Sequence, residues 1–517
     1  MKSPSCGNRQ DFSVTSPKPE SCKLVRGRPC TPCLELETFD REAQAILEED
    51  RRKILAEINQ RHDPFIRRLP VELASQIFAF CLPPQDHEAD PRYISLLWNN
   101  LKDRIKPFNI VLGAICRAWR QMAWSTPDLW STLPIGLHRG NNKTYMELIL
   151  EWLGRSGQTP LDVFLVYDRI AASVPLTEEY VDEYYKPLID IANGCSSRWR
   201  TFNVSGAGFV LAYITGDGQG TCILECLKIR GAYDRSDSPR FSLTNAIPIP
   251  SQLLSSAMPL RSIGIDWSNL ITIEIGDLYV NEFLVLLRWA PRLTRCTLNS
   301  LEDGSDEHLP PPTPTHHHTL RELDIRMLDV RQTAEQLLNL LILPSLSSLF
   351  HDSKFNSLEN VAAFLDRSAS RLTTFSDLNG DFHDLLVLAP HLQALERLEC
   401  PGSPVGGVQL PIRGDETIRN IFPNLREISL QSRRVFWCLL ADLILLCPLK
   451  TLTIHVEHFN PGHNRFWVDE ESACRFQDFI KNGYNIKIIY RLRGEKEDRD
   501  LLAWSAQSRM SQTRVAD

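Results

Sequence analysis

The sequence predicts an α/β protein in three parts: an N-terminal helical arm, a small all-α domain, and an irregular α/β array. Three observations predict this arrangement. Residues 34–62 contain neither Gly nor Pro, and two strongly apolar helical segments follow within residues 63–135. Leu-rich runs then recur at intervals of roughly 20 to 36 residues, which overlaps the period of solenoid repeats. At 517 residues, the chain is long enough for two or more domains.

Composition is typical of a globular protein in a reducing compartment. The net charge of −7 is mild for this length, and without a basic stripe we expect no nucleic-acid partner. The 14 Cys residues are scattered, several of them inside apolar helical stretches, as free thiols commonly are. No apolar segment follows Met1 and no run is long enough to span a bilayer. We therefore expect a cytoplasmic or nuclear protein with no membrane partner.

The N-terminal segment changes character near residue 34. Residues 1–33 are rich in Ser, Pro, Lys and Arg, which predicts a disordered tail. From Leu34 to His62, the apolar residues recur at three-, four- and seven-residue spacings: Ala43, Leu47, Ile54 and Ile58. This spacing predicts a helix over residues 34–62 with one apolar stripe. Such a helix either forms a short coiled coil or packs on the following domain.

Residues 63–135 predict a small all-α domain. Pro70 suits the first position of a helix that is apolar on nearly all sides, so this helix needs both a core and a partner protein. A second apolar helix is expected from Ile110 to Trp124, with Ile115 and Met122 in the core of the domain. Between the two helices, an acidic stretch predicts an insertion at about 84–107.

The two helices resemble an F-box. The resemblance is carried by Leu69-Pro70-Val71-Glu72-Leu73, Ile77-Phe78, Ile115-Cys116-Arg117-Ala118-Trp119-Arg120 and Pro127-Asp128-Leu129-Trp130. Together with Trp152-Leu153-Gly154 and Arg198-Trp199, these motifs resemble the fungal F-box-like proteins that place a helical arm before the motif. The insertion separates the two halves further than in a compact F-box. It either loops away from the partner or interferes with docking.

The resemblance implies docking onto the small adaptor subunit of a cullin–RING ubiquitin ligase. The positions carried over from the family as the adaptor-binding surface are Leu69, Pro70, Ile77, Phe78, Cys116 and Trp119. Aromatic and aliphatic anchors of this kind dominate interface energies, and truncation of one commonly costs about 2 kcal/mol or more. The alternative is that these side chains simply form the core of a small helical domain.

Residues 136–492 carry Leu-rich runs that resemble an irregular leucine-rich-repeat array. The runs begin at Leu224, Leu260, Leu293, Leu320, Leu346, Leu372, Leu392, Leu425 and Leu449. Alternate Leu residues of a strand point to one side, and units that cannot bury this side alone must stack. Helices are expected between the strands at 281–289, 335–342, 358–366 and 435–446. A curved solenoid is the predicted fold, a less regular α/β stack is the alternative, and 493–517 is expected to be a polar tail.

If the array is a solenoid, its concave face is the expected surface for recognising a protein target. The candidate target-binding residues are Arg321, Asp324, Arg326, Arg426, Ser429, Gln431, Thr453 and His455. The alternative is that they are ordinary solvated polar residues of exposed strands.

Other motifs do not predict a metal site, a cofactor or an active site. Cys30 and Cys33 form only half of a four-ligand zinc site, and His316-His317-His318 lies in a Pro-rich segment expected to be a flexible connector. The sequence contains no P-loop, Gly-x-Ser-x-Gly elbow or His-Glu-x-x-His motif. We therefore expect a non-enzymatic adaptor that recruits a protein target to a ubiquitin ligase. The alternative is an interaction scaffold unconnected with ubiquitin transfer.

Overall fold

The computed structural model describes the residues in the following ranges: 31–62, 69–82, 108–137, 143–167, 178–205, 208–216, 223–230, 241–243, 252–256, 260–302, 305–326, 331–351, 358–377, 388–403, 422–432, 437, 440–441, 444, 449–456, 468–490 and 499–505. The chain is mixed α/β and divides into two compact units. The first comprises residues 1–84 and 106–129, and the second comprises residues 85–105 and 130–517. The predicted insertion at 84–107 and most of the predicted tail at 1–33 lie outside the described residues.

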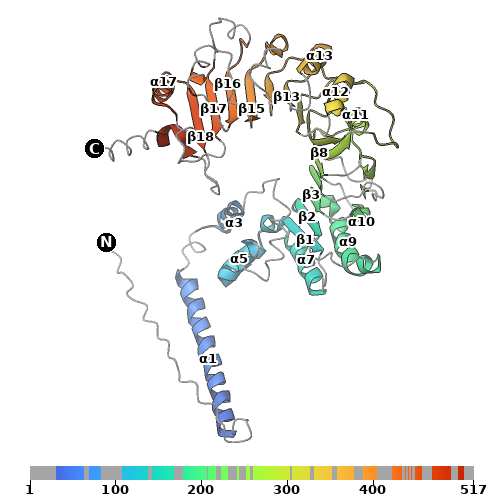
Figure 1. Cartoon of the computed structure of the whole chain (residues 1–517). Coiled ribbons are helices and arrows are strands. Elements are labelled where there is room, and N and C mark those ends of the chain that lie inside the picture. Colours follow the sequence, from blue (N-terminus) through green and yellow to red (C-terminus); the bar gives the residue numbers. More distant parts are fainter. Residues whose placement is uncertain are drawn as a thin grey trace, which may run out of the picture. The chain divides into compact units, whose positions relative to one another are not determined.

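The first unit contains four α-helices among its described residues. They are α1 (Thr31–His62), α3 (Val71–Phe80), α5 (Phe108–Ile115) and α6 (Arg117–Trp124), labelled as in Figure 1. The helix expected at 34–62 is present and starts three residues earlier. Helix α3 begins at Val71 with Pro70 as its N-cap, so Pro70 lies one position before the first helical residue instead of occupying that position as predicted.

The helix expected from Ile110 to Trp124 is two helices, because the backbone is extended at Cys116 (φ −155°, ψ 170°). The Cys116 sulfur accepts a hydrogen bond from the Trp119 N–H at 3.4 Å and so caps α6. The Arg120 Nε donates to the Gly113 carbonyl at 2.7 Å, which satisfies an acceptor at the end of α5. Sequence patterns miss this break because Ser, Thr, Asp and Asn are the usual N-caps, not Cys.

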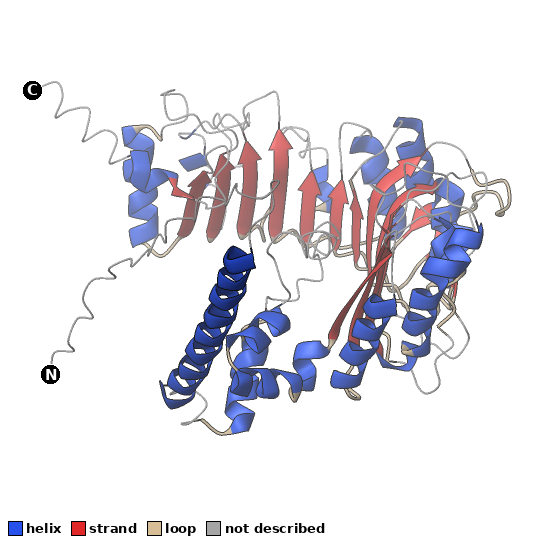
Figure 2. Ribbon diagram, turned by 90° about the horizontal axis from the view of Figure 1, so that it is seen from below, coloured by secondary structure: helices blue, strands red, loops and turns tan. Residues whose placement is uncertain are grey.

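The second unit is built on one 15-stranded sheet, whose strands lie side by side in sequence order. All neighbouring pairs are parallel except β18–β19. Figure 1 shows the sheet curving, with helices α7 to α17 on its outer side, and Figure 2 shows the strands edge to edge. The strands are β1 (Thr132–Leu137), β2 (Leu161–Tyr167), β3 (Trp199–Ser205), β4 (Cys226–Arg230), β6 (Gln252–Ser256), β8 (Thr272–Tyr279), β9 (Arg295–Glu302), β11 (Glu322–Ile325), β13 (Ser348–His351), β14 (Thr374–Asp377), β15 (Arg397–Ser403), β16 (Glu427–Ser432), β17 (Thr451–Val456), β18 (Asn485–Tyr490) and β19 (Arg499–Asp500).

Helices and short strands connect these fifteen strands. The helices are α7 (Lys143–Arg155), α8 (Glu178–Tyr180) running through a π-helical turn into α9 (Lys186–Gly194), α10 (Gly208–Ala212), α11 (Val280–Trp289), α12 (Arg331–Leu340), α13 (Leu358–Ser368) and α17 (Glu470–Lys481). Two small parallel pairs also form, β5 (Phe241–Ser242) with β7 (Ile263–Gly264), and β10 (Thr315–His316) with β12 (Leu341–Ile342). Helices are confirmed near 281–289, 335–342 and 358–366. The one expected at 435–446 lies mostly outside the described residues.

A repeated backbone arrangement sets the register of the sheet between β9 and β17. At the start of each strand, two successive N–H groups donate to one carbonyl of the preceding repeat. Ser347 and Ser348, for example, both donate to Arg321 at 2.8 and 2.9 Å. The Leu residues of the predicted runs are buried, but the run expected to pair Leu392 with Leu395 is shifted. Leu398 stands beside Phe375, and Leu392 lies in the preceding turn.

The two ends of the sheet differ from the predicted boundaries. Strand β1 starts at Thr132, so the sheet begins inside the range 63–135 that was assigned to the helical domain. Where a polar tail was expected from residue 493, β19 pairs antiparallel with β18, and Leu501 and Leu502 are buried. Strands β1 to β4 are buried on nearly every side chain, whereas β11 and β17 alternate between buried and partly exposed residues.

Candidate functional site

The adaptor-binding residues predicted from the sequence all lie in the first unit, but they differ in exposure. Phe78 is 2% exposed and its ring lies 4.8 Å from the Trp119 ring, so the two aromatics pack on each other between α3 and α6. Pro70 and Ile77 are exposed, and Leu69, Cys116 and Trp119 are partly exposed. The structure therefore combines a buried Phe78, packed on a partly exposed Trp119, with an accessible edge.

Helix α3 carries an apolar stripe on its exposed side. Leu73, Ile77 and Phe80 follow each other at spacings of four and three residues, which puts them on one face of the helix. Their exposed fractions are 47%, 38% and 88%. Ala74 and Phe78 occupy the buried side. We call Leu73, Ile77 and Phe80 the docking stripe.

Helix α5 also exposes apolar side chains. Val111 and Ile115, one turn apart, are both exposed, as is Trp124 at the end of α6. The expectation that Ile115 lies in the core is therefore wrong, whereas Met122 is buried as expected. The break at Cys116 explains this difference, since it ends α5 at Ile115 and starts a new helix in another direction.

The core of the helical unit is small and fixed by polar contacts. Asn109 is buried and its side chain donates to the Leu129 carbonyl at 3.2 Å. The Thr126 hydroxyl lies 2.9 Å from the Ser75 hydroxyl and 2.8 Å from the Met122 carbonyl, linking α3 to the end of α6. These contacts hold the docking stripe on a rigid element.

The predicted target-binding residues lie in the second unit, and most of them share one face of the sheet. Asp324 on β11, Ser429 on β16 and Thr453 on β17 alternate with buried residues, so they lie on the face opposite the buried Leu side chains. Ser429 stands directly beside Thr453, and Gln431 beside His455. We call this the sheet face.

The remaining predicted residues surround the sheet face. Arg321 and Arg426 precede β11 and β16 at equivalent places of the repeat, where each carbonyl accepts two N–H groups from the next strand. Arg326 follows β11 and pairs with Asp324 at 3.0 Å. The β11 group and the β16–β17 group are separated by β13, β14 and β15, so they form two clusters rather than one.

Sequence reasoning missed a continuous row of side chains that crosses the sheet face between these clusters. In register from β8 to β18, the row is Glu274, Thr297, Asp324, Phe350, Ser376, Glu399, Ser429, Thr453 and Lys487. Hydroxyls and carboxylates dominate it. Only the parallel register brings these residues together, because they are spread over more than 200 residues of sequence.

A second row closer to the strand starts carries two ion pairs. Arg295 binds Glu322 with contacts of 2.5 and 3.1 Å, and the Arg397 Nε donates to Glu427 at 2.9 Å. The Glu322 carboxylate raises the pKa of Arg295 above its usual value. Both pairs are half exposed, so each contributes at most about 1 kcal/mol to stability. Their main effect is to make this row electrically neutral.

Asp324 is the most constrained carboxylate of the sheet face. Burial raises the pKa of its carboxyl, although the Arg326 charge and hydrogen bond act in the opposite direction. One oxygen, Oδ1, is buried without a hydrogen-bond partner among the described residues.

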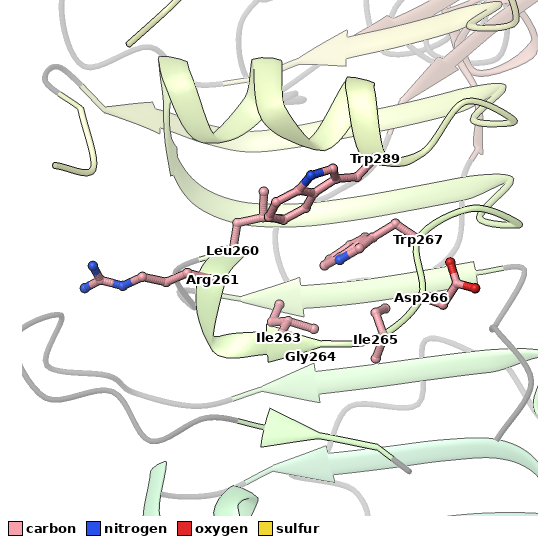
Figure 3. Close-up of a pocket in the computed structure, with 8 residues that line it drawn as sticks. All are labelled: Leu260, Arg261, Ile263, Gly264, Ile265, Asp266, Trp267 and Trp289. Atoms are coloured by element: carbon pink, nitrogen blue, oxygen red, sulfur yellow. The ribbon is translucent and has the colours of Figure 1, made fainter. Parts of the chain in front are cut away.

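Near β7, an apolar pocket opens between α11 and the loop that leads into β8. It has a volume of about 430 Å³, and its two indoles, Trp267 and Trp289, lie 6.3 Å apart. Figure 3 shows the side chains of Arg261 and Asp266 extending away from the indoles. Arg261 pairs with Asp306 at 3.0 Å instead. The remaining lining is apolar, with Leu260, Ile263 and Ile265 facing the same space.

The His-rich segment is part of the fold rather than a flexible connector. His316 belongs to β10, and the His317 side chain is only 3% exposed. His317 Nδ1 accepts a hydrogen bond from the Leu320 N–H at 3.1 Å, and Nε2 lies 3.0 Å from the Ala290 carbonyl. This geometry requires a neutral imidazole with its proton on Nε2.

Two comparisons of the chain with known proteins found no match. No protein-family model matches it, and a search of curated proteins finds no match. Within the described ranges, no helix is both long and apolar enough to cross a bilayer. In the same ranges, no three His, Cys, Asp or Glu side chains gather as metal ligands. Cys30 lies outside those ranges.

Proposed function

We propose that this chain is an F-box-like substrate-recognition adaptor. Its helical unit would dock onto the adaptor subunit of a cullin–RING ubiquitin ligase, and its leucine-rich-repeat-like unit would hold a protein target. Holding both partners on one chain raises the concentration of the target at the ligase without new chemistry.

The observation that carries the proposal is the docking stripe. A helical unit that exposes Leu73, Ile77 and Phe80 on one helix, and Val111 and Ile115 on another, presents apolar side chains that favour a protein partner. Leu69, Pro70 and Trp119 border the same helices and supply further anchors. Phe78 contributes by supporting the ring of Trp119 from inside the unit.

The sheet face supports the second half of the proposal. A row of polar side chains on parallel strands offers many hydrogen-bonding groups at strand spacing, as surfaces that recognise proteins do. Asp324 with Arg321 and Arg326 would form one contact region. Ser429, Gln431, Thr453, His455 and Arg426 would form a second one.

A second candidate function is an interaction scaffold outside ubiquitin transfer. It is favoured by the burial of Phe78 and the partial burial of Leu69 and Trp119, because residues that fill a core need no partner. In this second function the sheet face still binds a target, but the helical unit binds no ubiquitin-ligase adaptor.

The two functions are separated by a pull-down with the purified adaptor subunit. The full-length protein is compared with Ile77→Glu, which places a charge in the docking stripe, and with Val71→Glu as the matched control. Val71 is exposed on the same helix but on its other side. The adaptor proposal expects retention by the wild type and by Val71→Glu, and loss with Ile77→Glu. No retention by the wild type, or equal loss in both variants, favours the scaffold.

A further inference from the structure

Helix α1 exposes an apolar surface along its length. Every side chain from residue 35 to residue 58 is exposed, including Leu36, Leu47 and Ile54. A 32-residue helix is about 48 Å long, and most of the stability of protein helices comes from burying one face. No other segment in the described part of the chain covers α1, so the apolar side of this helix requires a partner.

Five of the exposed apolar residues follow a regular repeat, and Phe39, Ile46 and Leu55 are exposed outside it. Leu36, Ala43, Leu47, Ile54 and Ile58 are separated by seven, four, seven and four residues, which is an 11-residue period. Eleven residues make slightly more than three helical turns, so these side chains stay close to one side of the helix instead of winding around it. We call them the α1 stripe. A stripe of this kind fits another long helix better than it fits a compact domain.

Charged residues beside the α1 stripe indicate which long helix would cover it. Asp40 and Arg51 lie on the same side of the stripe and are also 11 residues apart. Arg52 pairs with Glu49 and Lys53 with Asp50 along the helix, whereas Asp40 and Arg51 form no ion pair among the described residues. In two antiparallel copies of one helix, the same sides face each other.

We propose that α1 pairs antiparallel with α1 of a second copy of this chain. In this register, Leu36 lies opposite Ile54, and the small Ala43 lies opposite the larger Leu47. Each Asp40 lies beside the Arg51 of the other copy, and the two-fold axis repeats every contact. A parallel pair leaves Asp40 and Arg51 on different sides and about 16 Å apart along the axis. The inference does not rest on the adaptor role.

The first test is the mass of the full-length protein by sedimentation equilibrium. The wild type is expected to be a dimer, and Leu47→Glu a monomer with unchanged circular dichroism in its sheet unit. Ala56→Glu is the control, because Ala56 is exposed on α1 but on the side away from the stripe. A monomeric wild type overturns the proposal, and so does a Leu47→Glu variant that remains a dimer.

The second test addresses the antiparallel arrangement. Asp40→Arg and Arg51→Asp each replace the two attractive contacts with repulsive ones and are expected to weaken the dimer by roughly tenfold. A mixture of the two variants restores complementary charges only in an antiparallel heterodimer, so it should regain wild-type affinity. Failure of the mixture to associate more tightly than either variant alone overturns the arrangement.

Discussion

Replacing His317 tests whether the His-rich segment is structural. The imidazole bridges the Leu320 N–H and the Ala290 carbonyl, both of which are buried. His317→Ala removes the imidazole and leaves the Leu320 N–H and the Ala290 carbonyl without this hydrogen-bond partner. Each buried polar group left unpaired costs about 1–3 kcal/mol. We therefore expect the free energy of unfolding of the sheet unit to fall by about 2–5 kcal/mol.

The same residue predicts a pH dependence. Burial lowers the pKa of His317 below its ordinary value of 6.5, and the nearby His318 acts in the same direction. Below pH 6.5, the unfolded chain therefore binds more protons than the folded one, so stability falls as the pH falls. The slope is at most about 1.4 kcal/mol per pH unit between 6.5 and the lowered pKa of the folded state. Above pH 6.5 the contribution is fully present.

The assay is urea unfolding of the full-length protein between pH 5 and pH 7.5, followed by hydrogen exchange of peptides covering 290–320. His317→Gln can keep both hydrogen bonds without titrating, so it should retain most of the stability at pH 7 and lose part of the slope. His318→Gln is the matched control, because that side chain is exposed. If His317→Gln keeps the pH dependence of the wild type, or if His318→Gln loses it, the buried His317 imidazole is not its source.

Three further predictions concern other parts of the chain. Leu323→Ala, at a 1% exposed position of β11, should lower the free energy of unfolding by about 2–5 kcal/mol, whereas Arg326→Ala should change it by less than about 1 kcal/mol. Both are measured by urea unfolding. Asp324→Asn should stabilise the protein at pH 7, because the raised pKa of the carboxyl means that its charged form is disfavoured in the folded state. The advantage should vanish as the pH falls through that pKa. Cys116→Ala should destabilise the helical unit by about 0.5–1 kcal/mol through loss of the α6 cap, and Cys116→Ser should not.

The parallel sheet could be predicted because its signal is local. Strands β11, β16 and β17 carry apolar residues at alternate positions, and the side chains of Leu323, Ile428 and Leu452 are buried as this alternation requires. Helix α1 could be predicted for the same reason, from an uninterrupted stretch of helix-forming residues with one apolar stripe.

The missed features depend on contacts that no local pattern carries. The break at Cys116 requires a sulfur cap and an arginine that folds back to Gly113. The burial of His317 depends on a carbonyl 27 residues away. Strand β19 is two residues long and gains its partner only by folding back on β18. The row across the sheet face becomes visible only when the strand registers are known.

A titration of purified adaptor subunit into the full-length protein measures whether the helical unit binds a cullin–RING ubiquitin ligase as we propose. We expect saturable binding that Ile77→Glu abolishes and Val71→Glu retains, with both variants folded. No binding by the wild type, under conditions in which a known F-box protein binds the same adaptor, would contradict it.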